Sequence, residues 1–178
     1  MENKNNGEIS VKEMPQMVVA SCFSTGRSPE SEVIQYMESW IKRHGIDYSR
    51  SRKFGFDIPV SEEQQKYGIR SFEYWVTVPE TTRDSEGVKV KLIDPTRYAV
   101  LRIKNPYKDP GIVIQAGWKM LQDWAEAYKL KTEGVKAAAG FEDEMLPEEE
   151  EEEKEKFMLE EIVETGDGLC LDLYYPLE

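Results

Sequence analysis

Two stretches decide the fold: SFEYWVTVP, residues 71–79, and LCLDLYYP, residues 169–176. Both alternate in side-chain character and end at a proline, which is typical of a strand with one covered and one uncovered face. The more apolar faces carry Phe72, Tyr74, Val76 and Val78, and Leu169, Leu171, Leu173 and Tyr175; the opposite faces carry Glu73, Trp75 and Thr77, and Cys170, Asp172 and Tyr174. We expect the apolar faces to pack against helices.

The elements around these stretches occur twice in the same order. Strands predicted at 9–23 and 87–104 are interrupted at Pro15 and at Asp94-Pro95, and each precedes a helix that opens at Ser28-Pro29 or at Asp109-Pro110. Two strands close each copy, at 53–58 and 71–78 in the first and at 157–163 and 169–175 in the second. The sequence therefore predicts strand-helix-strand-strand units in an α+β fold, with a mainly antiparallel sheet, helices on one face and a ligand cleft between the halves.

Proline spacing supports the duplication. Pro29 and Pro110 lie 81 positions apart, whereas Pro79 and Pro176, which end the last strand of each copy, lie 97 apart. The 16 extra positions follow the second helix. We therefore expect a tail at residues 1–8 and one domain at 9–177, built of repeats 9–80 and 87–177 with an acidic insertion at 131–156.

Charge is concentrated in that insertion. The 178-residue chain has a formal charge of −12. Residues 131–160 contain 12 acidic and 4 basic residues, so they carry −8 of it. The six glutamates of 148–153 are interpreted as a solvated segment, with docking to a basic partner as the alternative. No basic stripe exists that could neutralise phosphates, so direct nucleic-acid binding is not expected.

Composition also limits the cellular compartment that we expect for the protein and the cofactors that it could bind. No apolar run approaches the ~20 residues of a membrane span, and the opening MENKNNGEIS has no apolar signal region. Cys22 and Cys170 sit in apolar runs, which favours a reduced, cytoplasmic protein. His44 is the only histidine and lies at a predicted helix end, where a capping role is expected. We expect no metal and no cofactor.

The uncovered strand faces would combine aromatic rings with carboxylates, which suits a ligand pocket. The alternative is that these are ordinary solvent-facing strand residues. The preceding strand contains Glu160 and Glu161, and because neighbours in a strand point to opposite faces, one of them must face the sheet interior. Such a carboxylate has a raised pKa or needs a cationic partner. The alternative is an edge strand, where an inward charge prevents aggregation.

Together these pieces resemble the GyrI-like small-molecule-binding superfamily, which includes the gyrase inhibitory protein and the effector-binding domains of multidrug-responsive transcription activators. The resemblance covers residues 9–177. It rests on the opening strand from Pro15 to Gly26, on PTRYAVLRIKNPY with its following Trp118-bearing helix, and on LQDWAEAY, LEEIV and LCLDLYYPLE. Departures are the acidic insertion and Val163, which stands where an aromatic residue is common.

The resemblance implies a duplicated fold whose cleft binds flat, lipophilic, often cationic compounds with aromatic rings and a buried glutamate. Glu161 is favoured for that glutamate because an apolar pair follows it. The candidate ligand-binding residues are Glu73, Trp75, Tyr98, Trp118, Glu160, Glu161, Asp172 and Tyr174.

Three functions remain open. The first is a stand-alone binder that senses or sequesters a drug-like compound, since the fold already begins at residue 9 with no helix-turn-helix before it. The second is a hydrolase of cyclopropane-bearing alkylating compounds, an activity of some members, with Glu161 as general base and Tyr174 as hydrogen-bond donor to the substrate carbonyl. The third is a protein-interaction role like that of the gyrase inhibitory protein. The expected partner is a small lipophilic aromatic ligand, and exposed sheet edges leave a homodimer open.

Overall fold

The computed structural model describes residues 7–138 and 156–177. In these ranges the chain forms one eight-stranded sheet with helices, which is the predicted α+β class. The strands are β1 (Ser10–Met14), β2 (Met17–Gly26), β3 (Lys53–Ile58), β4 (Arg70–Thr77), β5 (Lys89–Ile93), β6 (Thr96–Lys104), β7 (Leu159–Thr165) and β8 (Gly168–Pro176). The helices are α1 (Pro29–Arg43), α2 (Glu62–Lys66) and α3 (Pro110–Ala138), with a 3-10 turn at Tyr48–Arg50.

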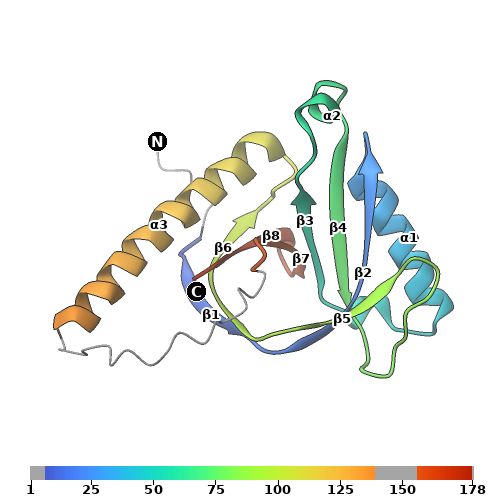
Figure 1. The fold of residues 1–178 in the computed structure, drawn as a ribbon, viewed down its shortest axis with the longest axis horizontal. Helices are drawn as coiled ribbons and strands as arrows, with labels where there is room; N and C mark the ends of the chain where they lie inside the picture. The colour runs from blue at the N-terminus through green and yellow to red at the C-terminus, as the bar shows by residue number, and fades with distance from the viewer. Residues whose placement is uncertain (1–6, 139–155, 178) are drawn as a thin grey trace, which may run out of the picture.

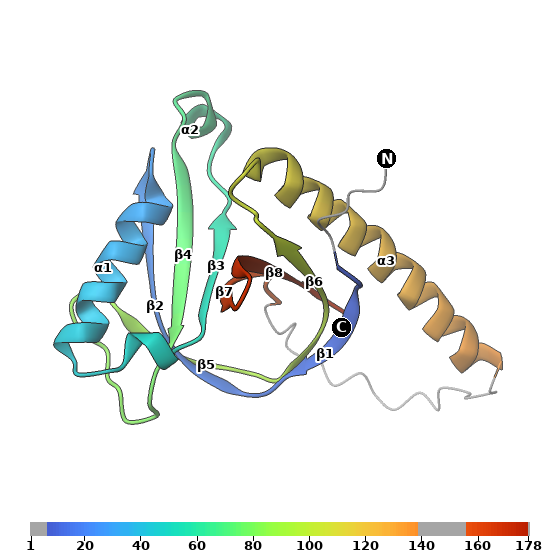
Figure 2. The same cartoon turned by 180° about the vertical axis from the view of Figure 1, so that it is seen from behind.

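The order of the strands is symmetric about the centre of the sheet. It is β1-β6-β8-β7-β3-β4-β2-β5, and every neighbouring pair is antiparallel. Each half contributes three adjacent strands, and the outermost strand on each side comes from the other half, because β1 pairs with β6 and β5 pairs with β2. The sheet curls into a half-barrel that carries α1 and α3 on its outer face (Figures 1 and 2).

The strand register reproduces the spacing of the prolines. Phe54 lies opposite Glu161 at the centre of the sheet. Phe54 also lies opposite Trp75, and Glu161 lies opposite Asp172, 97 positions after Trp75. One strand further out, Trp75 lies opposite Ser21 and Asp172 lies opposite Arg102, 81 positions after Ser21. The sheet thus has the two-fold symmetry that a duplication with the predicted offsets requires.

The two faces of the sheet carry different hydrophobic clusters. Under α1 lie Ala20, Phe72, Tyr74 and Val76, and under α3 lie Leu101, Ile103, Leu171 and Leu173. The faces that the sequence assigns to the helices in residues 71–79 and 169–176 do lie under them, except that Leu169 is exposed at the start of β8. The third cluster lies on the opposite, concave face; we call it the concave cluster, and it contains Met14, Met17, Val19, Phe54, Trp75, Tyr98, Val100, Leu159 and Tyr174.

Helix α1 forms where the sequence predicts it. Ser28 is the N-cap residue and Pro29 takes the first helical position, although the Ser28 side chain makes no capping hydrogen bond. The buried residues Val33, Met37, Trp40 and Ile41 recur at helical spacing. His44 is the C-cap residue, as predicted, and Gly45 follows with φ +69°, a conformation that glycine adopts without strain.

The structure differs from the sequence prediction at both long opening strands. Each is two strands that pair with different neighbours, not one interrupted strand: β1 pairs with β6, whereas β2 pairs with β4 and β5. Pro15 separates β1 from β2, and Pro95 separates β5 from β6. Proline has no N–H to donate to a ladder, so the chain changes partners at these positions.

Other differences concern the helices. Helix α2 and the 3-10 turn were not predicted, although Ser61 forms a capping box with Gln64 at the start of α2. Helix α3 continues to Ala138, so it includes the first part of the segment 131–156; the glutamates of 148–153 lie outside the described residues. In the described part of the chain, no helix combines the length and the apolar character needed to cross a bilayer.

Candidate functional site

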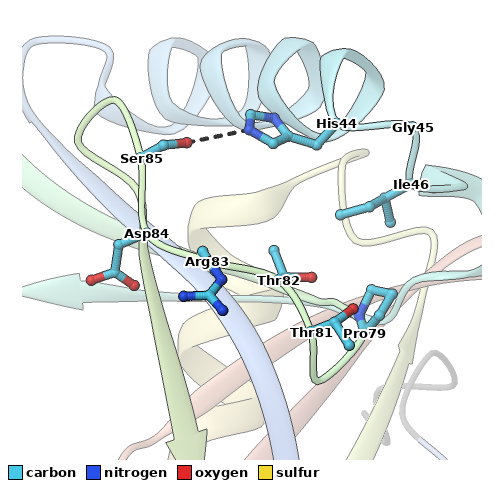
Figure 3. Close-up of a pocket in the computed structure, with 9 residues that line it drawn as sticks. All are labelled: His44, Gly45, Ile46, Pro79, Thr81, Thr82, Arg83, Asp84 and Ser85. Carbon is cyan, nitrogen blue, oxygen red and sulfur yellow. Dashed lines mark hydrogen bonds between the residues drawn. The ribbon is translucent and has the colours of Figure 1, made fainter.

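A cavity of about 450 Å³ lies between the end of α1 and the loop that follows β4 (Figure 3). His44 Nε2 is 3.3 Å from Ser85 Oγ there, and Trp40 Nε1 donates to the same oxygen at 3.0 Å. His44 Nδ1 is 2.7 Å from the Trp40 carbonyl oxygen, and the His44 ring stacks on Trp40. These contacts tie the loop to α1. The cavity contains none of the predicted ligand-binding residues.

Six of the eight predicted site residues lie together on the concave face. The registers place Trp75 opposite Phe54, Phe54 opposite Glu161 and Glu161 opposite Asp172, and directly opposite residues share a face. The six are Glu73, Trp75, Tyr98, Glu161, Asp172 and Tyr174. The alternation in residues 71–79 and 169–176 therefore assigned four of them, Glu73, Trp75, Asp172 and Tyr174, to the face opposite the helices.

Aromatic rings form the larger part of the concave face. Trp75 is fully buried, and its ring meets those of Phe56 and Phe157 edge-on at centroid distances of 5.2 and 5.0 Å. Tyr174 meets Tyr98 edge-on at 5.5 Å. Such pairs stabilise by about 0.5–1.5 kcal/mol beyond the burial of their area. The alternative in which these strand residues simply face solvent is therefore wrong for Trp75, Tyr98 and Tyr174, which are buried.

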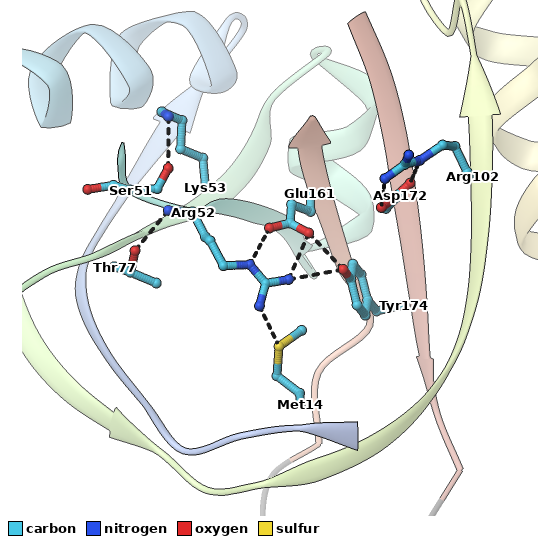
Figure 4. A network of polar contacts seen from close by, with 9 residues as sticks. All are labelled: Met14, Ser51, Arg52, Lys53, Thr77, Arg102, Glu161, Asp172 and Tyr174. Carbon is cyan, nitrogen blue, oxygen red and sulfur yellow. Dashed lines mark hydrogen bonds and ion pairs between the residues drawn. The ribbon is translucent and has the colours of Figure 1, made fainter. Parts of the chain in front are cut away.

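Glu161 is a buried carboxylate of this face, and it is paired (Figure 4). Arg52 Nε donates to Oε2 at 2.7 Å and Arg52 Nη2 donates to Oε1 at 2.9 Å, which is a bidentate ion pair. The Tyr174 hydroxyl donates to Oε1 at 2.7 Å. The Glu161 side chain is only 7% exposed, whereas that of Arg52 is 42% exposed. β7 lies between β8 and β3, so the edge-strand interpretation is wrong.

The environment of the network changes the proton affinity of its members. Burial, assisted by the hydrogen bond to Glu161, raises the pKa of Tyr174 above its usual value of 10.0. The hydrogen bonds to Glu161 raise the pKa of Arg52 above its ordinary value. The tyrosine therefore remains a neutral donor and the arginine a fixed cation throughout the physiological range.

Two further polar groups flank this network. Arg102 donates to both oxygens of the buried Asp172, from Nε at 2.8 Å and from Nη2 at 2.9 Å. Glu73 accepts a hydrogen bond from Trp75 Nε1 at 2.6 Å and pairs with Lys91 at 3.3 Å. Each carboxylate of the concave face thus has a cation beside it, and the face carries little net charge.

Glu160 and Trp118 do not join the other six residues. Glu160 lies on the helix face of β7, where Trp118 Nε1 of α3 donates to its carboxylate at 3.3 Å. Burial raises the pKa of Glu160 above its ordinary 4.5, and the Trp118 hydrogen bond opposes that shift only in part. Of the two adjacent glutamates, Glu161 is therefore the one on the concave face.

The geometry limits the chemistry that Glu161 can perform. A general base needs a free lone pair beside the proton that it removes. Oε1 of Glu161 accepts from Arg52 Nη2 and from the Tyr174 hydroxyl, so both of its lone pairs are used, whereas Oε2 accepts from Arg52 Nε alone and keeps one. The Tyr174 hydroxyl that was to polarise a substrate carbonyl is donated to Glu161, so this arrangement does not favour the hydrolase hypothesis. In the described ranges, no group of His, Cys, Asp and Glu side chains could hold a metal ion.

Sequence reasoning missed Arg52 and Phe157. Arg52 precedes β3 by one position, and extending that strand backwards by alternation would have placed it on the face of Phe54 and Phe56. Its pairing with Glu161 joins positions 109 apart, which no local pattern predicts. Phe157 lies before β7, and only the fold places its ring over Trp75.

Comparison with known proteins identifies the fold. No family model matches the chain, and no curated protein sequence matches it. The chain is similar to the EcmrR C-terminal domain, with 12% identity, a TM-score of 0.65 and coverage of 96% of this chain and 97% of that one. It is also similar to the EcmrR chain in a complex with DNA in EcmrR-RPo, with 12% identity and a TM-score of 0.63. That match covers 97% of this chain but 57% of the EcmrR chain, so the present chain spans a little over half of the EcmrR chain.

A third similar structure is SAV2435 bound to tetraphenylphosphonium, with 12% identity over 97% of this chain and 94% of that one and a TM-score of 0.47. The chain has the fold of the EcmrR C-terminal domain, and the α+β fold expected from the sequence is confirmed.

Proposed function

We propose that this protein binds lipophilic, aromatic small molecules, cations among them, on the concave face of its sheet, and that it senses or sequesters them. The observation that carries the proposal is the concave cluster, in which rings from both halves surround a buried carboxylate on the face opposite to the helices. A core that served only stability would have no need of charged groups, because buried ion pairs contribute little net stability.

Phe157 supports an aromatic ligand. It belongs to no strand, it is half-buried, and its ring packs against both Phe56 and Trp75 at centroid distances of 5.0 Å. This packing supports a surface at Phe56 and Trp75 that accepts a ring. A flat ligand would take the position of Phe157, with an edge-on contact to Trp75 and a tilted one to Phe56, and with Tyr98 and Tyr174 further along the face.

Glu161 supports a ligand that carries delocalised positive charge. A cation over an aromatic face gains about 0.5–2 kcal/mol, and the Arg52 guanidinium already lies 5.0 Å from the Phe54 ring centroid while it binds Glu161. This contact supports the proposal that a planar cation can lie against a ring and Glu161 together on this face. The compartment that we propose is the cytoplasm, since Cys22 and Cys170 are buried free thiols.

Thermal unfolding with rhodamine 6G, a flat lipophilic cation, tests the proposal. At a concentration 100-fold above Kd, the ligand adds about 2.7 kcal/mol of stability, which raises Tm by about 5 °C or more for a chain of this size. An absence of any Tm shift with rhodamine 6G and with other flat aromatic compounds, charged and neutral, would contradict the proposal.

A matched pair of variants locates the site. Trp75 and Trp40 are both fully buried, and each indole N–H has one side-chain partner, but they lie on opposite faces of the sheet. Trp75→Phe should lower the ligand-induced Tm shift by more than half, because it reduces the ring surface at the site. Trp40→Phe should keep the shift, and equal losses in both variants would show that the concave face is not the site.

A further inference from the structure

The cation position of the proposed site is occupied by the chain itself. Arg52 uses Nε and Nη2 on Glu161, a second Nη2 hydrogen bond on the Tyr174 hydroxyl at 3.2 Å, and Nη1 on Met14 Sδ at 3.1 Å. Its ring contact is with Phe54. A planar, delocalised cation surrounded by a carboxylate, a phenol, a thioether and a ring is the environment that a lipophilic cationic ligand would need (Figure 4).

We infer that Arg52 determines the charge preference of this site: it acts as an internal cation, and a ligand cation reaches Glu161 only by displacing it. The inference rests on the proposed function. It follows from charge balance, because a cation that meets the intact Glu161–Arg52 pair meets a neutral group and gains no ion pair. As built, the site should therefore distinguish ligands by shape and ring contact more than by charge.

The position of Arg52 makes its displacement feasible. Its side chain is 42% exposed, so a released guanidinium would move into water without crossing the core. Its backbone stays in place independently, since Arg52 N donates to Thr77 Oγ1 at 2.8 Å and Arg52 O accepts from Thr77 N at 3.0 Å. Only the side chain would have to swing away from Glu161, and a neutral variant of it should leave β3 in place.

Tetraphenylarsonium and tetraphenylborate test the inference, because they share size and shape and differ in the sign of their charge. Isothermal titration calorimetry in sodium buffer gives Kd for both, and the ratio of the two constants measures charge preference alone. In Arg52→Met and Arg52→Gln this ratio should move at least about tenfold toward the cation, the change that 1.4 kcal/mol produces. In Arg52→Met combined with Glu161→Gln it should return to the wild-type value.

Arg97→Met is the matched control. Arg97 is 40% exposed and pairs with Glu13 at 2.9 Å, so the variant removes the same charge at similar exposure from a pair whose carboxylate is 77% exposed. The ratio of the two Kd values measured for Arg97→Met should equal the wild-type ratio. An unchanged ratio in both Arg52 variants, or an equal change in Arg97→Met, overturns the inference while binding of both probes upholds the proposed function. Failure of both probes to bind any of these folded proteins overturns the inference and the proposed function together.

Discussion

Glu160 and Glu161 show that a shift of one position along a strand changes the face of the sheet on which a side chain lies and the partners that it contacts. The two carboxylates are adjacent in β7, so the alternation of the strand sends them to opposite faces. Glu161 meets a guanidinium and a phenol on the concave face, whereas Glu160 meets an indole N–H beneath α3. The sequence predicts the separation of the two residues but not their partners, because Arg52 and Trp118 come from distant parts of the chain.

The ion pair at Glu161 should be asymmetric in its effect on stability. Arg52→Met leaves a buried carboxylate without its cation, whereas Glu161→Gln leaves an arginine that is 42% exposed and can be hydrated. Loss of one partner from a buried pair destabilises by about 3–5 kcal/mol. The exposure of Arg52 reduces this to about 2 kcal/mol for Arg52→Met and about 1 kcal/mol for Glu161→Gln. Urea unfolding at pH 7 measures both; the reverse order would show that Glu161 is not the buried member.

The burial of Glu160 predicts the direction in which the free energy of unfolding changes with pH. Burial raises its pKa in the folded protein above 4.5, so the folded state holds the proton more tightly than the unfolded chain. The stability that protonated Glu160 contributes is fully present below the unfolded pKa and is lost as the pH rises through the folded pKa. Glu160→Gln removes this loss.

The free energy of unfolding of Glu160→Gln relative to the wild type should therefore increase from about pH 4 to about pH 7. Trp118 Nε1 can still donate to the amide oxygen of the variant. Glu164→Gln, at an exposed position of the same strand, is the control and should show no such trend. A difference for Glu160→Gln that stays constant or decreases with pH would contradict the burial of this carboxylate.

At the scale of elements, Gly117 sets the distance between α3 and the sheet. A Cβ at this position would lie 2.8 Å from Ile103 Cδ1 and 2.9 Å from Leu173 Cδ1, so these two side chains, or the helix, would have to shift. Gly117→Ala should destabilise the protein by about 1–3 kcal/mol through overpacking. Gly134→Ala in the same helix meets nothing within 4 Å and should stabilise by about 0.5–1 kcal/mol, as alanine does in helices. Chemical denaturation gives both values, and stabilisation by Gly117→Ala would contradict the packing of α3.

The elements that could be predicted were those with a local signal. Strand β3 was predicted at its observed bounds, Lys53–Ile58, and the start of α1 was predicted from Ser28 and Pro29. The splitting of the opening strands was not predictable in this way. Whether a chain bulges at Pro15 or changes partners there depends on β6, which lies more than 80 positions later.

The exchange of outer strands makes the molecule one unit. β1 belongs to the first half and pairs with β6 of the second, and β5 makes the reciprocal pairing with β2. Neither half can therefore complete its sheet alone, and we expect a single cooperative unfolding transition. Far-UV circular dichroism, which follows the backbone, and tryptophan fluorescence, which follows Trp40, Trp75, Trp118 and Trp124, should give the same urea midpoint. Two separate transitions would indicate independent halves.

At the scale of the whole molecule, the duplication was predictable from the sequence. The set of side chains that packs together on the concave face was not. Proline offsets of 81 and 97 reappear in the register of the sheet. The register of the sheet makes Phe54 of one half equivalent to Glu161 of the other, so symmetry of the backbone does not imply symmetry of the chemistry. The rings and the ion pair that meet inside the half-barrel come from five strands, β3, β4, β6, β7 and β8, and from residues that flank them, and only the folded sheet brings them together.

The crystal structure of the protein with rhodamine 6G tests the central claim most directly. The account predicts the xanthene ring on the concave face, in contact with Trp75 where Phe157 now packs, and with its charged edge toward Glu161. Density for the dye on the helix face beside Trp118 and Glu160, or in the cavity at His44, with the rings of the concave cluster unmoved, would contradict it.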